Sequence, residues 1–307
     1  MSRKARFKEG SCGRRGFLKL LTVTAVGAMA LPSESEAFDL DAFIQRHFKE
    51  LDKEALAKTL RRLEEKYDHD YGRDDFKVRA DGPQPGVHYA YALNLSKCIG
   101  CRRCVQACVE ENNQHRGDPE RGDRIDYIRV LEMEKGSLNV EKSEHFYDHE
   151  VPAEGKYYMP VQCHHCNDAP CVKACPVEAT WQEPDGIVVV DYNWCIGCRY
   201  CAAACPYWAR KFNWVKPRIP SEEINPDTHY LGNRPRYQGV MEKCTFCINR
   251  VRRGLNPACH DICPTGSRKF GNLLDENSVI RQIIATKRVF ILKEEVGTDP
   301  SFYYFFD

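Results

Sequence analysis

Sixteen cysteines fall into four groups of four, with spacings typical of iron–sulfur ligands. The chain has 17 cysteines in 307 residues, too many for an ordinary intracellular enzyme, and it is too long for a small disulfide-stapled domain. The four quartets are Cys98, Cys101, Cys104 and Cys108; Cys163, Cys166, Cys171 and Cys175; Cys195, Cys198, Cys201 and Cys205; and Cys244, Cys247, Cys259 and Cys263. The first and third quartets share the spacing C-x2-C-x2-C-x3-C, and both begin with Cys-Ile-Gly-Cys.

This spacing predicts [4Fe–4S] cubanes, each of which takes one thiolate per iron. In bacterial two-cluster ferredoxins, three closely spaced cysteines surround one cluster, and a fourth, followed by proline, binds the neighbouring cluster. Pro176, Pro206 and Pro264 follow the fourth cysteine of three quartets, whereas Val109 follows that of the first. We therefore expect the quartets to work in pairs and the sixteen cysteines to ligate the iron of four [4Fe–4S] clusters.

Two other interpretations of the cysteines remain open. A zinc-binding scaffold also uses C-x2-C pairs, but it requires neither a third cysteine three residues later nor a fourth before proline. Disulfides form outside the cytoplasm, although closely spaced C-x2-C pairs suit metal better. The sequence shows no nucleophile–base pair, phosphate-binding loop or carboxylate dyad, so we expect no catalytic residues. The formal charge of +1 gives no indication of nucleic acid as a partner.

The N-terminal segment has the order of features found in an export signal. Seven basic side chains fall within residues 1–19, which include the pair Arg14-Arg15, and an apolar stretch occupies residues 20–31. The arginine pair resembles the twin-arginine signal, which directs folded proteins across the cytoplasmic membrane. We expect residues 1–37 to be this signal peptide and the protein to be periplasmic. Cys12 lies inside the segment and is not an expected ligand.

The elements around the cysteines are predicted from periodicity and turn residues. Apolar residues at steps of three and four predict a helix over residues 41–67, with Asp39 or Asp41 as its N-cap. The other predicted elements are a linker at 81–86, strands at 89–95, 125–130 and 187–190, a proline-rich irregular insert at 216–240, a helix near 276–286 and a strand near 288–292. No run of 18 apolar residues is present, so no conventional membrane span is predicted.

Residues 87–295 resemble the four-cluster ferredoxin-like subunits of membrane-associated oxidoreductases. This family includes electron-transfer subunits of formate dehydrogenase, of dimethyl sulfoxide and polysulfide reductases, and of periplasmic hydrogenases. Besides the first and third quartets, the resemblance rests on Cys163-His164-His165-Cys166-Asn167-Asp168-Ala169-Pro170-Cys171, on Lys243-Cys244-Thr245-Phe246-Cys247 with Cys259–Pro264, and on Arg268-Lys269-Phe270-Gly271-Asn272.

The resemblance implies an α+β fold built from two pseudo-repeated dicluster ferredoxin-like modules with long inserts and an N-terminal helix. Residues 87–150 with 237–307 would hold quartets one and four, residues 151–236 would hold quartets two and three, and residues 38–86 would form the helix and linker. The implied ligand sets are Cys98, Cys101, Cys104 with Cys263; Cys244, Cys247, Cys259 with Cys108; Cys163, Cys166, Cys171 with Cys205; and Cys195, Cys198, Cys201 with Cys175.

The resemblance also implies a function. The chain would relay electrons between a membrane-integral quinone-interacting subunit and a catalytic oxidoreductase subunit or a multihaem cytochrome. A partner would hold it at the membrane, and the helix at 41–67 and the insert at 216–240 are candidate contact surfaces because neither carries cysteine. The alternative is an autonomous soluble polyferredoxin that diffuses between its partners.

Several residues close to the quartets have predicted supporting roles. His164 and His165 are expected to contact the ligands without binding iron. Trp194, Trp208 and Trp214 are expected to cover the third quartet against water. The basic residues expected to offset cluster charge or to meet a partner are Arg102, Arg103, Arg199, Arg210 and Lys211.

Overall fold

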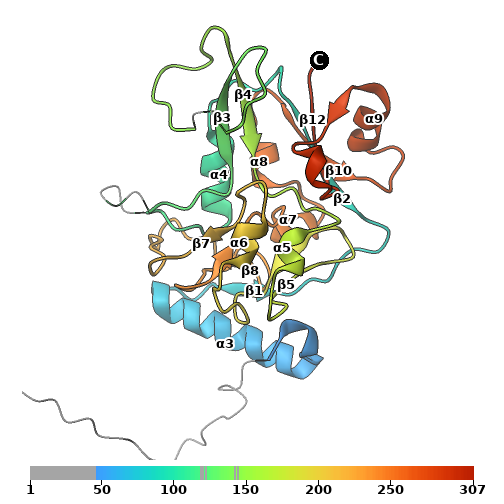
Figure 1. The fold of residues 1–307 in the computed structure, drawn as a ribbon. Coiled ribbons are helices and arrows are strands. Elements are labelled where there is room, and N and C mark those ends of the chain that lie inside the picture. The colour runs from blue at the N-terminus through green and yellow to red at the C-terminus, as the bar shows by residue number, and fades with distance from the viewer. Residues whose placement is uncertain (1–45, 118–120, 122, 142, 144) are drawn as a thin grey trace, which may run out of the picture. The chain divides into compact units, whose positions relative to one another are not determined.

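The computed structural model describes residues 46–307 except 118–120, 122, 142 and 144 (Figure 1). The predicted signal peptide, Cys12, Asp39 and Asp41 lie outside the described residues. The helices are η2 Phe48–Glu50, α3 Lys53–Tyr71, α4 Arg103–Glu111, α5 Pro170–Lys173, α6 Tyr200–Ala204, α7 Ile248–Val251, α8 Ala258–Asp261, α9 Val279–Thr286 and η3 Glu294–Val296. The strands are β1 Lys77–Arg79, β2 Tyr89–Asn94, β3 Arg129–Glu134, β4 Lys156–Val161, β5 Thr180–Gln182, β6 Val188–Val190, β7 Lys211–Phe212, β8 Asp227–His229, β9 Met241–Glu242, β10 Arg268–Asn272, β11 Val289–Phe290 and β12 Phe302–Phe305.

The largest sheet has four strands in the order β10-β2-β12-β11. Strand β2 pairs antiparallel with β10 and parallel with β12, so both of its edges are occupied. Its side chains alternate between large and small, and successive side chains of a strand point to opposite faces. Tyr91 and Leu93 therefore enter the main core, while Ala90 and Ala92 leave room for α9 on the other face (Figure 1).

The long N-terminal helix begins later than predicted. Helix α3 starts at Lys53, because the side chain of Asp52 accepts a hydrogen bond from the Ala55 backbone N–H at 2.8 Å and caps the helix there. The predicted span of 41–67 is therefore wrong at both ends, since the helix continues to Tyr71 and stops at Gly72, which is left-handed. Leu63 and Tyr67 are buried, so the helix packs on the core.

Most predicted strands near the cysteines are confirmed. Strands β2 and β6 match the predictions at 89–95 and 187–190, and α9 and β11 lie within the predicted ranges near the C-terminal end of the sequence. The strand predicted at 125–130 is wrong, because pairing with β4 sets Arg129 opposite Val161 and places β3 over Arg129–Glu134. Strands β4, β5, β10 and β12 were not predicted.

The insert at 216–240 is an ordered part of the core and not a loose loop. Every residue from 228 to 236 is buried, and β8 pairs in parallel with β1. Arg234 donates a hydrogen bond to the Tyr67 hydroxyl at 3.2 Å, and that hydroxyl donates to the Pro235 carbonyl at 3.2 Å. The insert thus anchors α3, and its central part is unsuited to the partner contact predicted from the sequence.

The mixed helices and small sheets confirm the α+β class in its general form. Helix α4 of quartet one contacts α8 of quartet four, and α5 of quartet two contacts α6 of quartet three. The described residues belong to one compact unit. Along these residues, no helix has the length and apolar character required to cross a bilayer.

Candidate iron–sulfur cluster sites

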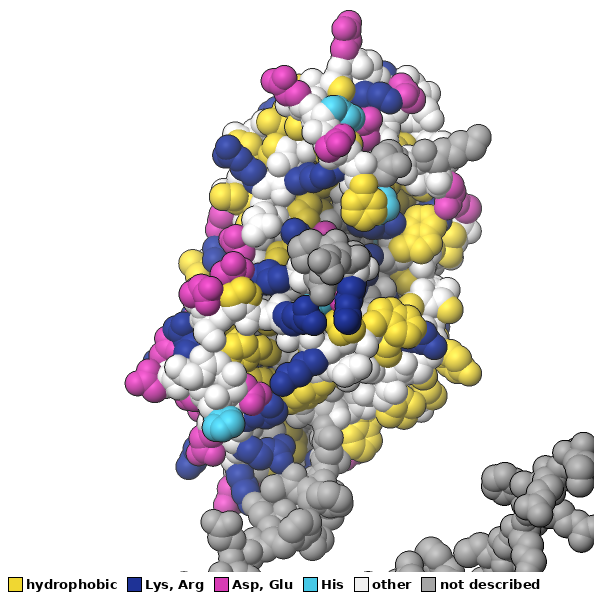
Figure 2. Space-filling model, turned by 90° about the vertical axis from the view of Figure 1, so that its left-hand side faces the viewer, with side chains coloured by type: hydrophobic (Ala, Val, Ile, Leu, Met, Phe, Trp, Pro, Cys, Tyr) yellow, Lys and Arg dark blue, Asp and Glu magenta, His cyan; other side chains and the backbone are white. Residues whose placement is uncertain are grey.

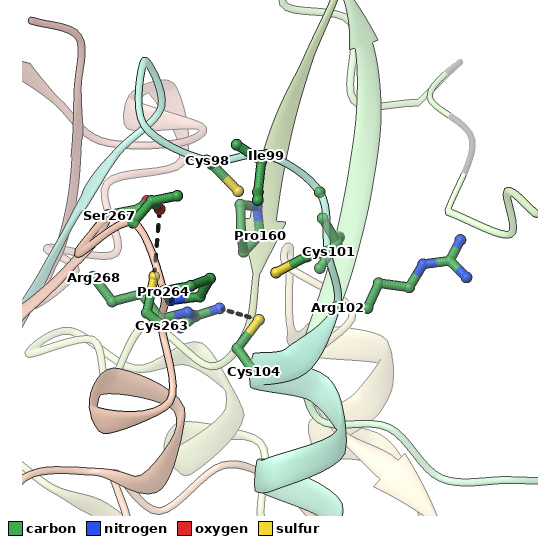
Figure 3. A pocket seen from close by; sticks show the side chains of 13 residues that line it. Cys98, Ile99, Cys101, Arg102, Cys104, Pro160, Cys263, Pro264, Ser267 and Arg268 are labelled. Carbon is green, nitrogen blue, oxygen red and sulfur yellow. Dashed lines mark hydrogen bonds between the residues drawn. The ribbon is translucent and has the colours of Figure 1, made fainter. Parts of the chain in front are cut away.

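The first cavity, site 1, is lined by Cys98, Cys101 and Cys104 together with Cys263 (Figure 3). The first three come from the loop after β2 and the start of α4, and Cys263 follows α8. Gly100 allows this loop to curl, because its φ is +73° and an added Cβ would lie 2.5 Å from the Tyr158 ring.

Two thiols of site 1 have opposite pKa shifts. Burial raises the pKa of Cys98 to about 12, although the Gly100 backbone N–H opposes that shift. Burial also raises the pKa of Cys263, but hydrogen bonds from the backbone N–H groups of Arg268, Ser267 and Thr265 and from the Thr265 hydroxyl outweigh it, and the net shift is downward. The loop around Cys263 is therefore built to stabilise a thiolate.

Site 2 brings Cys108 of quartet one to Cys244, Cys247 and Cys259 of quartet four. All four are buried. Burial raises the pKa of Cys108 well above its usual value, and the three neighbouring thiols raise it further. The sulfurs of this site have neutral hydrogen-bond donors: Gln114 Nε2 lies 3.2 Å from Cys108 Sγ, Asn112 Nδ2 lies 3.6 Å from both Cys108 Sγ and Cys247 Sγ, and the Tyr91 hydroxyl lies 3.3 Å from Cys259 Sγ.

Site 3 is a cavity lined by Cys163, Cys166 and Cys171 with Cys205 from the third quartet. Its remaining walls are largely apolar and include Val188, Ala169, Pro170, Pro206 and Tyr207. Burial raises the pKa of Cys166 to about 12, and nearby thiols add to the shift. The site thus combines four sulfurs with walls that keep water out.

Site 4 contains Cys195, Cys198 and Cys201, with Cys175 nearby. The Cys201 thiol faces both Cys195 and Cys175, and burial raises its pKa to about 11. The backbone N–H of Met241 donates to Cys195 Sγ at 3.5 Å. Of the sixteen described cysteines, Cys198 is the exposed one.

Sites 1 and 4 repeat one backbone shape. In the first quartet Gly100 and Arg102 have φ values of +73° and +54°, and in the third Gly197 and Arg199 have +69° and +66°. Left-handed residues on both sides of the second cysteine turn the chain round a concave space, where backbone N–H groups can stabilise negative charge. The repeated Cys-Ile-Gly-Cys sequence therefore corresponds to a repeated local fold.

The residues at these sites fit [4Fe–4S] clusters. Each site combines three cysteines of one quartet with the fourth cysteine of another, and amide, hydroxyl or guanidinium donors lie at the sulfurs. In the described residues, no three His, Cys, Asp or Glu side chains converge as ligands of a single metal ion would. A cubane binds its four thiolates through four separate irons, so its cysteines lie farther apart than the ligands of a single metal ion.

The two histidines of quartet two pack among aromatic rings. His164 is fully buried, its pKa is lowered to about 3 by burial, and its Nε2 lies 3.2 Å from the Tyr304 hydroxyl. His165 accepts a hydrogen bond from the Val188 N–H at 2.9 Å and stacks on Phe246 with a centroid separation of 3.7 Å. Both rings therefore support the loop of quartet two as neutral groups.

The prediction of a tryptophan cover over the third quartet is wrong for two of the three rings. Trp214 is 62 % exposed and Trp208 is 38 % exposed. Trp208 lies beneath the side chains of Arg129 and Lys293, and Trp214 lies beneath Arg199. Cation–π contacts hold both rings, and Trp214 also packs edge-on against Phe212 at a centroid separation of 4.6 Å.

Among the basic residues expected to offset cluster charge, Arg210 contacts a cysteine, because its Nη2 lies 3.1 Å from Cys171 Sγ. Arg102 points away from the site 1 cavity (Figure 3) and stacks on Tyr147 at 3.7 Å. Sequence reasoning missed Arg268 and Lys243. Both belong to segments that carry the family resemblance, which was the available signal.

Comparison with known proteins identifies the family. The 4Fe-4S dicluster domain matches the chain over residues 97–179 and again over 155–221 with 230–273. A protein named as an iron–sulfur subunit of dimethyl sulfoxide reductase from Halobacterium salinarum is 42% identical over 218 residues, which is 71% of this chain and 79% of the relative.

Two further relatives have names that refer to other reactions. A selenate reductase subunit of Mesobacillus selenatarsenatis is 35% identical over 76% of each chain. The iron–sulfur cluster-binding subunit of menaquinone reductase from Nitratidesulfovibrio vulgaris is 35% identical over 71% of this chain and 88% of the relative.

The chain therefore belongs to the 4Fe-4S dicluster family of oxidoreductase iron–sulfur subunits. Its two dicluster domains hold four [4Fe–4S] clusters. It is an electron-transfer subunit and not the catalytic component of its oxidoreductase.

Proposed function

We propose that the sixteen cysteines bind the four clusters in the crossed sets of sites 1 to 4, and that these clusters form one electron path. The observation that carries the proposal is the order of the sites. Site 1 adjoins site 2, because Arg268 reaches both Cys104 and Cys259. Site 2 adjoins site 3, because Gln162, which directly precedes Cys163, lies 3.8 Å from Cys244 Sγ. Site 3 adjoins site 4, because α5, which carries Cys171, contacts α6, which carries Cys201. Electrons would enter at one end of this series and leave at the other.

The partners of this path are proposed from the relatives and the N-terminal motif. One relative is named as a menaquinone reductase subunit and another as a selenate reductase subunit, which supports transfer between a membrane quinone-interacting subunit and a catalytic subunit or multihaem cytochrome. The Arg14-Arg15 pair supports a periplasmic location reached by twin-arginine export.

The exposed end of the path favours a docked subunit over a freely diffusing polyferredoxin. Ile196 and Tyr200 are each 64 % exposed next to Cys198, and Trp214 lies close by through Arg199. Exposed apolar side chains that gather in one patch mark protein contact surfaces. Figure 2 shows one face of the molecule, on which lysine and arginine side chains gather along the middle and hydrophobic side chains lie beside them.

Metal analysis tests the cluster assignment. Protein purified without oxygen should contain about sixteen iron and about sixteen sulfide, with broad visible absorption near 400 nm that bleaches on reduction. Stoichiometric zinc without a visible band would contradict the proposal and favour the scaffold interpretation.

Cell fractionation tests the proposed location. The double variant Arg14→Lys with Arg15→Lys should accumulate in the cytoplasm with its clusters intact, because the signal is recognised by a receptor and not by its charge. The wild-type chain in the same cells is the control. Equal periplasmic amounts of variant and wild type would contradict twin-arginine export.

A further inference from the structure

Three buried cations near the cysteines have no carboxylate partner. Arg268, Lys243 and Arg210 are 2 %, 0 % and 6 % exposed, and within the described chain no Asp or Glu forms an ion pair with any of them. The acidic groups that raise their pKa values are cysteine thiols, together with the Tyr91 hydroxyl beside Arg268. A buried charge without a counter-ion is strongly unfavourable. These three residues therefore require an anion, and among the described side chains only cysteines lie in position to hold one.

Other buried arginines show the contrast. Arg236 pairs with Glu242 at 3.3 Å, and Arg252 pairs with Asp185 at 3.0 Å. Arg234 lies against the rings of Tyr192, Tyr230 and Tyr237. Away from the clusters the core therefore provides carboxylates or aromatic faces for cations, whereas Arg268 has cysteine sulfurs besides its one aromatic face, the Tyr91 ring at 5.6 Å.

Arg268 lies between sites 1 and 2. Its Nη2 is 3.4 Å from Cys104 Sγ and its Nη1 is 3.7 Å from Cys259 Sγ. The contact with Cys104 is visible in Figure 3, where the guanidinium reaches the cavity from β10. Gln162 holds the Arg268 guanidinium in place, because Gln162 Oε1 accepts a hydrogen bond from Arg268 Nη1 at 2.8 Å.

Arg210 has the same relation to sites 3 and 4. Its Nη2 lies 3.1 Å from Cys171 Sγ and 2.9 Å from the Thr180 hydroxyl. Its charge also faces Cys201 of site 4. Its second terminal nitrogen, Nη1, is buried and has no hydrogen-bond acceptor among the described protein atoms, which leaves one buried donor unsatisfied by the protein.

Lys243 lies between sites 2 and 3. It immediately precedes Cys244 of site 2. Burial lowers the pKa of Lys243, the Arg210 guanidinium lowers it further, and the thiols Cys163 and Cys171 of site 3 oppose that shift. Its Nζ donates to the Cys244 carbonyl at 2.6 Å, which holds the ammonium group at the junction. Gln162 adds a donor there, since its Nε2 lies 3.8 Å from Cys244 Sγ.

We propose that Arg268, Lys243 and Arg210 are shared counter-ions, one in each gap between successive clusters, and that they raise the reduction potentials of both clusters that each one faces. A positive charge between two clusters stabilises the added electron on either one, so it raises both reduction potentials without favouring either direction of transfer. Each cubane with its four thiolates has a net charge of about −2, which is the missing anion. This inference rests on the ligand sets proposed above.

The test is a redox titration of the purified, cluster-loaded protein, followed by electron paramagnetic resonance. Lys243→Gln should shift the clusters of sites 2 and 3 to lower potential and leave those of sites 1 and 4 less affected. Lys243→Arg, which keeps the charge, should restore the wild-type values. Arg234→Gln, which removes a buried cation that faces tyrosines, should leave all four potentials unchanged.

The outcomes separate this inference from the proposed function. Wild-type protein without four clusters would overturn the proposed function. Four intact clusters in Lys243→Gln with unchanged potentials, or an equal shift of all four, would overturn the shared counter-ion role alone. If Lys243→Gln does not assemble its clusters, Arg210→Gln provides the test. It should lower the reduction potentials of the clusters in sites 3 and 4. A cluster-loaded Arg210→Gln variant without that shift would overturn the inference.

Discussion

Cys108→Ser should damage the cluster of site 2 and spare that of site 1, although Cys108 follows the site 1 cysteines in the sequence. The Cys108 thiol is buried beside Cys244, Cys247 and Cys259, so its loss removes the fourth ligand of that set. We expect the loss or conversion of one cluster, with up to about a quarter of the iron released. Iron analysis and electron paramagnetic resonance of the purified protein measure this change.

Cys104→Ser is the matched control for this variant. It removes a cysteine from the same helix, α4, but one that lines the site 1 cavity. Its spectrum should show the opposite pattern, with site 1 altered and site 2 retained. If both serine variants alter the same cluster, the crossed ligand sets are wrong.

Gly197→Ala should prevent the loop of site 4 from closing. A Cβ at this position would lie 2.0 Å from the Gly239 carbonyl oxygen, and the backbone φ is +69°. The left-handed conformation costs a non-glycine residue about 1–2 kcal/mol, and overpacking adds about 1–3 kcal/mol. We expect loss of the site 4 cluster together with a lower temperature of irreversible unfolding, measured by iron content and thermal denaturation.

Gly254→Ala separates backbone strain from the steric clash. Gly254 has a φ of +78°, but nothing lies within 4 Å of an added Cβ. This variant should be destabilised only by the conformational cost of about 1–2 kcal/mol and should keep four clusters. Equal behaviour of the two alanine variants would show that the close approach to Gly239 is unimportant.

The cysteine sites were predictable because a cluster takes most of its ligands from one short segment, and this requires a characteristic cysteine spacing. Three ligands within one short loop have to lie close together, and the loops repeat the same left-handed residues. Arg268 was not recognised as a cluster neighbour, because its contacts join segments far apart in the sequence. Arg268, for example, reaches Cys104 across 164 positions. A basic residue in a sequence gives no sign of such a partner.

Polar burial explains the error over the insert at 216–240. Its prolines and asparagines are typical of a surface loop, but here the asparagines satisfy buried backbone groups. Asn113 Nδ2 donates to the carbonyls of Asn225 and Asn233 at 2.8 and 3.0 Å. Asn233 in turn donates to the Glu111 carbonyl. A core held by such hydrogen bonds has no hydrophobic periodicity to detect.

The start of α3 shows a different limit. Apolar spacing of three and four residues continues through positions 44–56, and two earlier aspartates also fit the role of cap. The start is set by the extended conformation of Leu51 and the side chain of Asp52. Tertiary contacts fix the segment before this start, such as the hydrogen bond from the Phe48 N–H to Asp191 at 3.1 Å, which no local pattern contains.

The pairing of β12 with β2 has a consequence for the order of events on the ribosome. Strand β2 is made early, but Tyr91 does not acquire its neighbour Phe302 until the ribosome has passed residue 302. On the proposed ligand sets, all eight cysteines of sites 3 and 4 emerge by residue 205, whereas sites 1 and 2 also need cysteines from 244 to 263. Because domains begin to fold during synthesis from the N-terminal side, we expect sites 3 and 4 to receive iron first. Site 1, which needs Cys263, would then receive its cluster last, and the sheet that contains β2 would close only after residue 302.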